Sequence, residues 1–213
     1  MVRLAQQNDW VIFIILGAIL VFIIVMQYLQ RQSGLGAFFT QNFIDSGNIF
    51  PTWLIVSVVY AVLLATFVSS YIPILPKFTE EFSLFGYSLN KFGFALLGVS
   101  VFYILKFFFT FFLYSSIGQD KKWGRLYFVS SKFYMAVSIL LIIANMVNYY
   151  FNIDREKLFA ISVLSAAMIF IFKNFFYAFN RNYILPNEWY YKFLYICTLQ
   201  FAPVLALWKL LFY

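Results

Sequence analysis

The lysine at position 106 is the residue whose surroundings fit its chemistry least. It precedes the run Phe-Phe-Phe-Thr-Phe-Phe-Leu, and it lies 12 residues after Phe94 and 11 before Ile117. At 1.5 Å per residue, about 17 Å of helix separates it from either end of this apolar stretch. If the stretch crosses a membrane, the ammonium group either snorkels to the headgroups along its apolar stem or binds a polar partner.

Acidic residues are absent from the apolar stretches. All eight Asp and Glu fall in the polar segments between these stretches or at their ends. A charged Lys106 is therefore expected to meet a backbone carbonyl, a lipid phosphate or an acid on another subunit. The same absence weighs against a proton pump or cation carrier, because such proteins place Asp or Glu in the membrane interior.

Carboxamide side chains form the second group of polar residues within apolar stretches: Asn145, Asn148, Asn174 and Gln200. In hydrocarbon such groups usually form hydrogen bonds with a neighbouring helix, worth about 0.6–2 kcal/mol each. We predict that structural role for them. The alternative is a polar path in which Lys106, Asn145, Asn148 and Gln200 line the route of a transported solute.

Several kinds of chemistry are excluded by composition. The chain has no histidine, so imidazole ligation and histidine acid–base catalysis are impossible. Its single cysteine, Cys197, lies in an apolar stretch, where a packing role is expected. We predict no catalytic residues, no metal site and no cofactor, and thus a non-enzymatic protein.

The composition as a whole indicates an integral membrane protein. Of the 213 residues, 64% are hydrophobic and 11% are charged, which cannot cover a water-soluble globule. Apolar stretches long enough to cross a bilayer predict an all-α, polytopic helical bundle forming a single integral membrane domain over residues 1–213. Six helices are expected, with five as the alternative, at about residues 10–29, 53–72, 94–117, 133–151, 158–179 and 191–212.

A basic cluster follows the third predicted helix. Lys121, Lys122, Trp123 and Arg125 are read as a loop that contacts anionic lipid headgroups, with no role for nucleic acid. The excess of basic residues in this loop favours a cytoplasmic location for it, with both termini outside. Lys173, further along the chain, is expected to join this side by snorkelling. A phosphorylated, lipid-linked substrate of a membrane enzyme is the alternative ligand of the loop.

Two features concern helix packing. Ser162 and Ala166 belong to a face of small residues in the fifth predicted helix, which allows close approach of another helix of this chain or of a partner. Pro203 lies inside the sixth predicted helix, where a kink is expected because proline cannot donate a backbone hydrogen bond.

Three parts of the sequence together resemble a known family. They are Asn8-Asp9-Trp10, Lys106, and the pattern Tyr195-x-Cys197-x-Leu199-x-x-Ala202-Pro203. The resemblance is to small polytopic membrane proteins of Bacteroidetes-type bacteria, catalogued as domain of unknown function 4271, and it covers most of the chain. In that family an acid often stands where this chain has Gln200, so a pairing with Lys106 could here be at most a hydrogen bond.

The resemblance implies a multi-pass protein of the bacterial inner (cytoplasmic) membrane, in a lineage that carries its own secretion, gliding and respiratory complexes. We therefore predict an assembly or accessory subunit of a larger envelope complex. Its expected partners are membrane lipids and other integral membrane subunits or further copies of itself. A small transporter or channel around Lys106 and a membrane enzyme remain the alternatives.

Overall fold

The computed structural model describes most of the chain. The described residues are 9–29, 34–44, 46–72, 83–84, 87–151, 154–179, 184–186 and 188–212. The helical elements are α2 (Asp9–Ile24), the π-helical η1 (Val25–Leu29), α3 (Leu35–Thr40), α4 (Ile49–Ser69), α6 (Lys91–Ser116), α7 (Asp120–Tyr150), α8 (Arg155–Phe179), α9 (Trp189–Leu194), the π-helical η2 (Tyr195–Phe201) and α10 (Ala202–Phe212). Two antiparallel strands of two residues each, β1 (Ser83–Leu84) and β2 (Tyr87–Ser88), form a hairpin. In it Ser83 pairs with Ser88 and Leu84 pairs with Tyr87.

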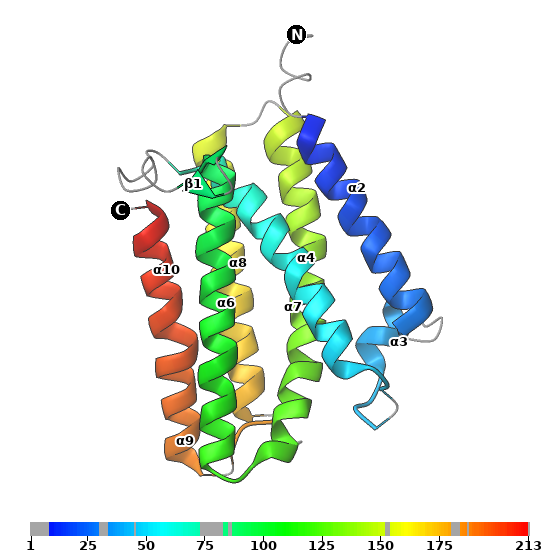
Figure 1. Cartoon of the computed structure of the whole chain (residues 1–213), viewed down its shortest axis with the longest axis vertical. Coiled ribbons are helices and arrows are strands. Elements are labelled where there is room, and N and C mark those ends of the chain that lie inside the picture. The colour runs from blue at the N-terminus through cyan, green and yellow to red at the C-terminus, as the bar shows by residue number, and fades with distance from the viewer. Residues whose placement is uncertain are drawn as a thin grey trace.

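The helical bundle expected from the sequence is confirmed. Within the described residues, six helical spans are long and apolar enough to cross a membrane: residues 9–29, 49–69, 91–116, 122–150, 156–179 and 189–212. The chain is thus a multi-pass membrane protein. Successive spans alternate in direction, so the start of α2 and the end of α10 lie at the same end of the bundle (Figure 1).

The fourth span is longer than predicted. The sequence suggested a start near residue 133, after a basic loop, but α7 begins at Asp120. Lysine, arginine and tryptophan are compatible with a helix that extends beyond the hydrocarbon, so the apolar run marks the membrane-embedded part of a helix and not its end. The turn from α6 is made at Gly118, whose φ of 69° lies in the left-handed region that glycine adopts without steric cost.

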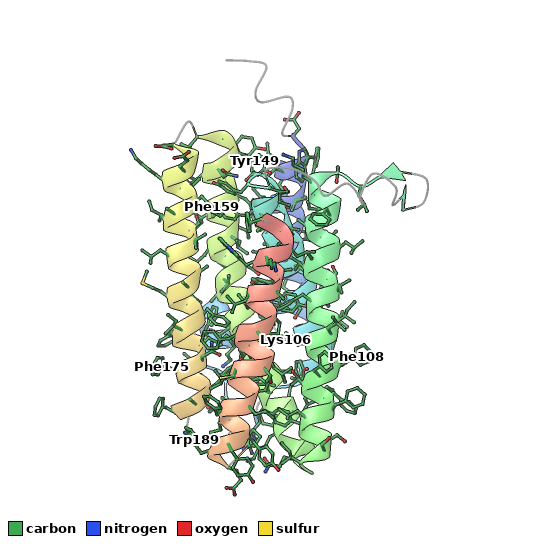
Figure 2. The ribbon with its side chains drawn as sticks, turned by 90° about the vertical axis from the view of Figure 1, so that its left-hand side faces the viewer. Lys106, Phe108, Tyr149, Phe159, Phe175 and Trp189 are labelled. Carbon is green, nitrogen blue, oxygen red and sulfur yellow. The ribbon has the colours of Figure 1, made fainter. Side chains whose placement is uncertain are left out.

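The helix α4 lies at the centre of the packing. It contacts α2, α6 and α7, and the main cluster of buried apolar side chains joins Phe22 of α2, Leu63 of α4 and Met135 of α7. The short helix α3 adds Phe38, which is 1% exposed, to the same cluster. The outer spans α6, α8 and α10 present most of their apolar side chains outward, as Phe108 and Phe175 do in Figure 2. Hydrocarbon tails are the solvent for that surface.

The last span is not a uniform α-helix. The π-helical turn η2 precedes Pro203, whose nitrogen cannot donate to the carbonyl group one turn earlier. The proline that predicted a kink therefore lies next to a widened turn. Within η2 the side chains of Tyr195, Leu199 and Gln200 are buried, so this turn brings two polar side chains into the bundle.

Candidate functional site

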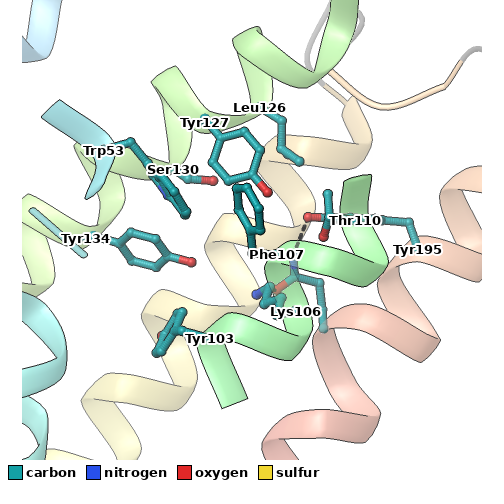
Figure 3. Close-up of a pocket in the computed structure, with 11 residues that line it drawn as sticks. Trp53, Tyr103, Lys106, Phe107, Thr110, Leu126, Tyr127, Ser130, Tyr134 and Tyr195 are labelled. Atoms are coloured by element: carbon teal, nitrogen blue, oxygen red, sulfur yellow. Dashed lines mark hydrogen bonds between the residues drawn. The ribbon is translucent and has the colours of Figure 1, made fainter. Parts of the chain in front are cut away.

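A chain of hydrogen bonds connects Lys106 to the last span. The Nζ of Lys106 donates to Gln200 Oε1 at 2.8 Å, and Gln200 Nε2 donates to the Tyr195 hydroxyl at 2.9 Å. Lys106 lies away from both ends of the bundle, between α6 and the last span (Figures 2 and 3). It follows the start of α6 by 15 residues and precedes its end by 10, so about 22 Å and 15 Å of helix separate it from the two ends. Its ammonium group has a polar partner within the chain and does not depend on the headgroups.

Another lysine in the same part of the bundle is buried, whereas Lys106 is half-buried. Lys173 of α8 is 7% exposed, and its Nζ lies 5.1 Å from the ring centroid of Tyr134 and 5.4 Å from that of Tyr177. The Tyr177 hydroxyl is hydrogen-bonded to Ser130 Oγ at 2.8 Å. The expectation that Lys173 snorkels to the surface is therefore wrong. Aromatic faces surround its ammonium group and supply cation–π attraction in place of water.

No carboxylate neutralises these two lysines within the described part of the chain. The acids with described positions are Asp9, Asp120, Asp154, Glu156 and Glu188, and each lies at or beside the start of a helix. The prediction that the membrane interior of this chain carries no acid thus holds for the described residues. An intramembrane cation without an acidic partner is expensive, and such residues usually mark function.

Three tyrosines pack together beside these lysines, and this group was not predicted from the sequence. The group consists of Tyr60 of α4, Tyr103 of α6 and Tyr134 of α7. Their rings pack with centroids 5.1–5.6 Å apart. The available signal was their position deep inside apolar stretches, where a tyrosine hydroxyl needs a partner that hydrocarbon cannot provide.

The four amide residues expected to bond to neighbouring helices lie in different parts of the bundle. Asn145 Nδ2 donates to the Leu63 carbonyl at 3.1 Å and to the Leu141 carbonyl at 2.9 Å, which ties α7 to α4. Asn148 makes the same connection one turn later, where it accepts from the Tyr71 hydroxyl at 2.8 Å and donates to Ser70 Oγ at 2.7 Å.

Only Gln200, of the four amides, bonds to Lys106. Asn174 of α8 is 6% exposed, and both polar atoms of its amide are buried without a hydrogen-bond partner among the described residues. The structure therefore divides the proposed polar path into an α4–α7 group and a separate group around Lys106.

The basic cluster is part of a helix and not a loop. Trp123 packs inside the bundle, with ring centroids 4.9 Å from Tyr127 and 5.5 Å from Phe111. Arg125 is exposed, and its guanidinium carbon lies 5.6 Å from the Phe43 ring centroid. Lys122 is half-buried, and the side chain of Lys121 lies outside the described structure. Headgroup binding by the basic residues stays a prediction, whereas Trp123 faces protein.

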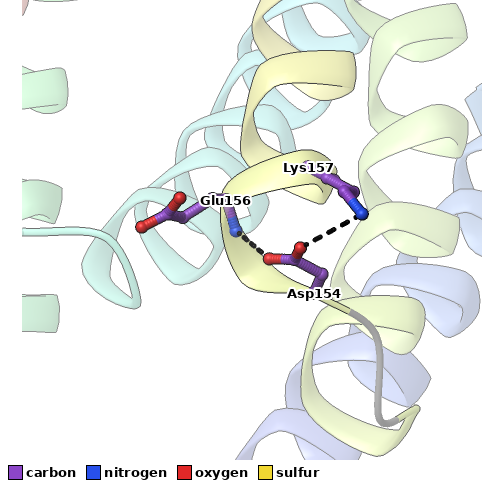
Figure 4. Close-up of polar contacts among 3 residues, drawn as sticks. All are labelled: Asp154, Glu156 and Lys157. Carbon is purple, nitrogen blue, oxygen red and sulfur yellow. Dashed lines mark hydrogen bonds and ion pairs between the residues drawn. The ribbon is translucent and has the colours of Figure 1, made fainter.

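The small-residue face of α8 points away from the bundle. Ala166 and Ala167 are exposed, and Ser162 is half-buried. The helix itself starts after a charged turn in which Asp154 Oδ1 accepts from the Glu156 backbone N–H at 3.1 Å and Oδ2 lies 3.5 Å from Lys157 Nζ (Figure 4). Within the described part of the chain, Ala166 is exposed and is not used for close helix packing.

The aromatic and polar residues around Lys106 line a small, partly open cavity of about 20 Å³ (Figure 3). Its walls come from α4, α6, α7 and η2 and include Trp53, Tyr103, Tyr134 and Gln200. A space of this size holds about one water-sized guest. Chemically, the arrangement can hold a small polar or charged species in place, and the described residues around it offer no nucleophile paired with a general base.

Comparison with known proteins identifies the family of this chain. No curated protein and no solved structure matches this chain. One family, described as Domain of unknown function (DUF4271), matches residues 10–211, which is nearly the whole chain and includes all six spans except their outermost residues. This match covers the lysine in the third span, the π-helical turn before Pro203 and the six alternating helices. The chain belongs to the DUF4271 family.

Proposed function

We propose that this chain is a non-enzymatic accessory or assembly subunit of a larger complex in the inner membrane, and that α8 contacts the partner. The observation that carries the proposal is the outward small-residue face of α8 around Ala166 and Ala167. In lipid there is no hydrophobic driving force between helices, so association depends on close packing, which small residues allow.

The degree of burial of α8 supports the same assignment. Only 11% of its apolar segment is buried in the described structure, compared with 56% for α4. Its inner side is nevertheless anchored, because Lys173 and Tyr177 are buried and Phe170 packs on Phe201 with ring centroids 5.2 Å apart. A helix fixed on one side and lined with small residues on the other is suited to bridging two subunits.

The alternatives receive less support from the geometry. A transporter path through Lys106, Asn145, Asn148 and Gln200 would have to connect two groups of residues that bond to different helices. The enzyme alternative depended on the basic cluster, whose Trp123 packs inside the protein. The subunit proposal requires neither a continuous path nor a reactive centre.

The test is purification in mild detergent from native membranes at endogenous expression, with mass spectrometry of bound proteins. Ala166→Leu is expected to remove a stoichiometric partner while the melting temperature of the chain stays unchanged. The matched control is Ala206→Leu, the same change at an exposed position of α10, which should retain the partner. A chain that purifies without any partner contradicts the subunit proposal. Loss of the partner with the control alone would move the contact to α10.

A further inference from the structure

The cavity beside Lys106 has an unusual set of lining groups. It is lined by aromatic rings, by hydroxyl groups including those of Thr110 and Ser130, and by the Lys106 side chain. No Asp or Glu is among its lining residues. The polar groups that face this space are therefore donors or hydroxyls, apart from the Gln200 carbonyl oxygen, which already accepts from Lys106.

One donor at this cavity has no acceptor. The indole Nε1 of Trp53 is buried and makes no hydrogen bond with any described residue. An indole N–H can only donate, so a buried one requires an acceptor. Lys106 likewise keeps donors to spare, because an ammonium group carries three N–H bonds and the bond to Gln200 uses one.

The basic groups at this place have no acidic partner among the described residues. Besides Lys106, the Nζ of Lys173 lies 5.1 Å from the ring centroid of Tyr134, one wall of the cavity. Two like charges in a medium of low dielectric repel each other strongly, and an anion between or beside them is stabilised by both. A neutral water molecule in the same space would meet the hydrogen-bonding demand but would leave the charge uncompensated.

We propose that the cavity lined by Trp53, Tyr103, Lys106 and Tyr134 binds one monoatomic anion, with chloride as the expected ligand. The cavity of about 20 Å³ has room for a single monoatomic ion. Lys106 supplies charge, Trp53 supplies an N–H donor, and the tyrosine hydroxyls complete the shell. The bound anion joins α4, α6 and α7 and acts as a structural ligand that offsets the charge of the half-buried Lys106.

The test is thermal unfolding of the purified chain, followed by tryptophan fluorescence, in chloride or gluconate at constant ionic strength and pH. A ligand at about 100 times its Kd raises Tm by roughly 5–10 °C for a chain of this size. Chloride and bromide are expected to raise Tm, and gluconate and sulfate are not. Lys106→Met should abolish the dependence, and the control Lys209→Met, at an exposed position of α10, should retain it.

A second variant keeps the test decisive if Lys106→Met does not fold. Trp53→Phe retains the aromatic wall and removes the N–H donor, and it should raise the half-saturating chloride concentration about tenfold or more. Equal Tm in chloride and gluconate would overturn the proposal in favour of a water-filled cavity. A chloride response that survives both Lys106→Met and Trp53→Phe would overturn it as well, because the anion would then bind elsewhere.

Discussion

Replacement of Gln200 by glutamate should stabilise this protein, although it adds a charge to the membrane interior. Gln200 Oε1 accepts from Lys106 Nζ at 2.8 Å, and the substitution exchanges that amide for a carboxylate of nearly the same shape. The Tyr195 hydroxyl, which now accepts from Gln200 Nε2, can turn to donate to the new carboxylate. No partner is lost, and Lys106 gains a counter-charge, which no described acid in the membrane interior supplies.

The size of the effect follows from two opposing contributions. At 2.8 Å and an effective dielectric constant of about 20, the attraction between unit charges is about 6 kcal/mol. Burial of the carboxylate costs several kcal/mol after relaxation, and the existing hydrogen bond of about 1.5–3 kcal/mol is replaced. The expected net gain is about 1–2 kcal/mol, which corresponds to a rise in Tm of roughly 2–8 °C.

A double-mutant cycle tests this reasoning. Gln200→Glu is combined with Lys106→Met, and the Tm and the free energy of unfolding of all four proteins are measured in chloride-free buffer. The double variant should be less stable than Lys106→Met alone, since it buries a carboxylate without its partner, at a cost of about 3–5 kcal/mol. If Gln200→Glu changes stability equally with and without Lys106, the two side chains are not coupled and the assignment of the pair is refuted.

Two further predictions concern the turns that connect the helices. Gly118→Ala should destabilise the protein by about 1 kcal/mol or more, because the φ of 69° strains alanine. The control Gly17→Ala, at a helical position with open space, should stabilise the protein by about 0.5–1 kcal/mol. If the two substitutions changed the free energy of unfolding equally, the strain expected at Gly118 would be contradicted. Asp154→Ala should cost about 1 kcal/mol because Asp154 caps α8. Lys157→Ala should change stability by less than about 0.5 kcal/mol, since its ion pair is exposed, and a larger effect would show that the pair matters.

The membrane spans were predictable because their signal is local. A run of about 20 apolar residues is visible without any knowledge of the neighbouring helices, and all six runs are helical in the structure. The start of α7 at Asp120 was missed for the complementary reason. Hydropathy indicates where a helix enters the hydrocarbon. The residue at which α7 begins depends instead on the preceding turn at Gly118 and on contacts such as those of Trp123.

The candidate site was predictable in part. Lys106 stood out because a charge within an apolar run has an obvious cost. The residues alone suggested a backbone carbonyl, a lipid phosphate or an acid of another subunit as its partner, and only the family resemblance pointed to the hydrogen bond with Gln200. Lys173 was misread, because its position near the end of a span fits snorkelling as well as burial. Tyr103 and Tyr134 gave no local sign that their rings pack together, since residues far apart in sequence reveal contacts only once the helices are assembled.

The sequence by itself determined that this chain is an all-α membrane protein, that the interior of the apolar stretches carries lysine without acid, and that histidine chemistry is impossible. These conclusions follow from composition and from the free energy of placing each residue type in hydrocarbon, which needs no partner. The tertiary structure decided which polar groups meet: Asn145 with the backbone of α4, and Lys106 with Gln200 near Tyr134 and Lys173. The rotation and depth of each helix set those contacts, and these depend on the packing of side chains from several helices at once.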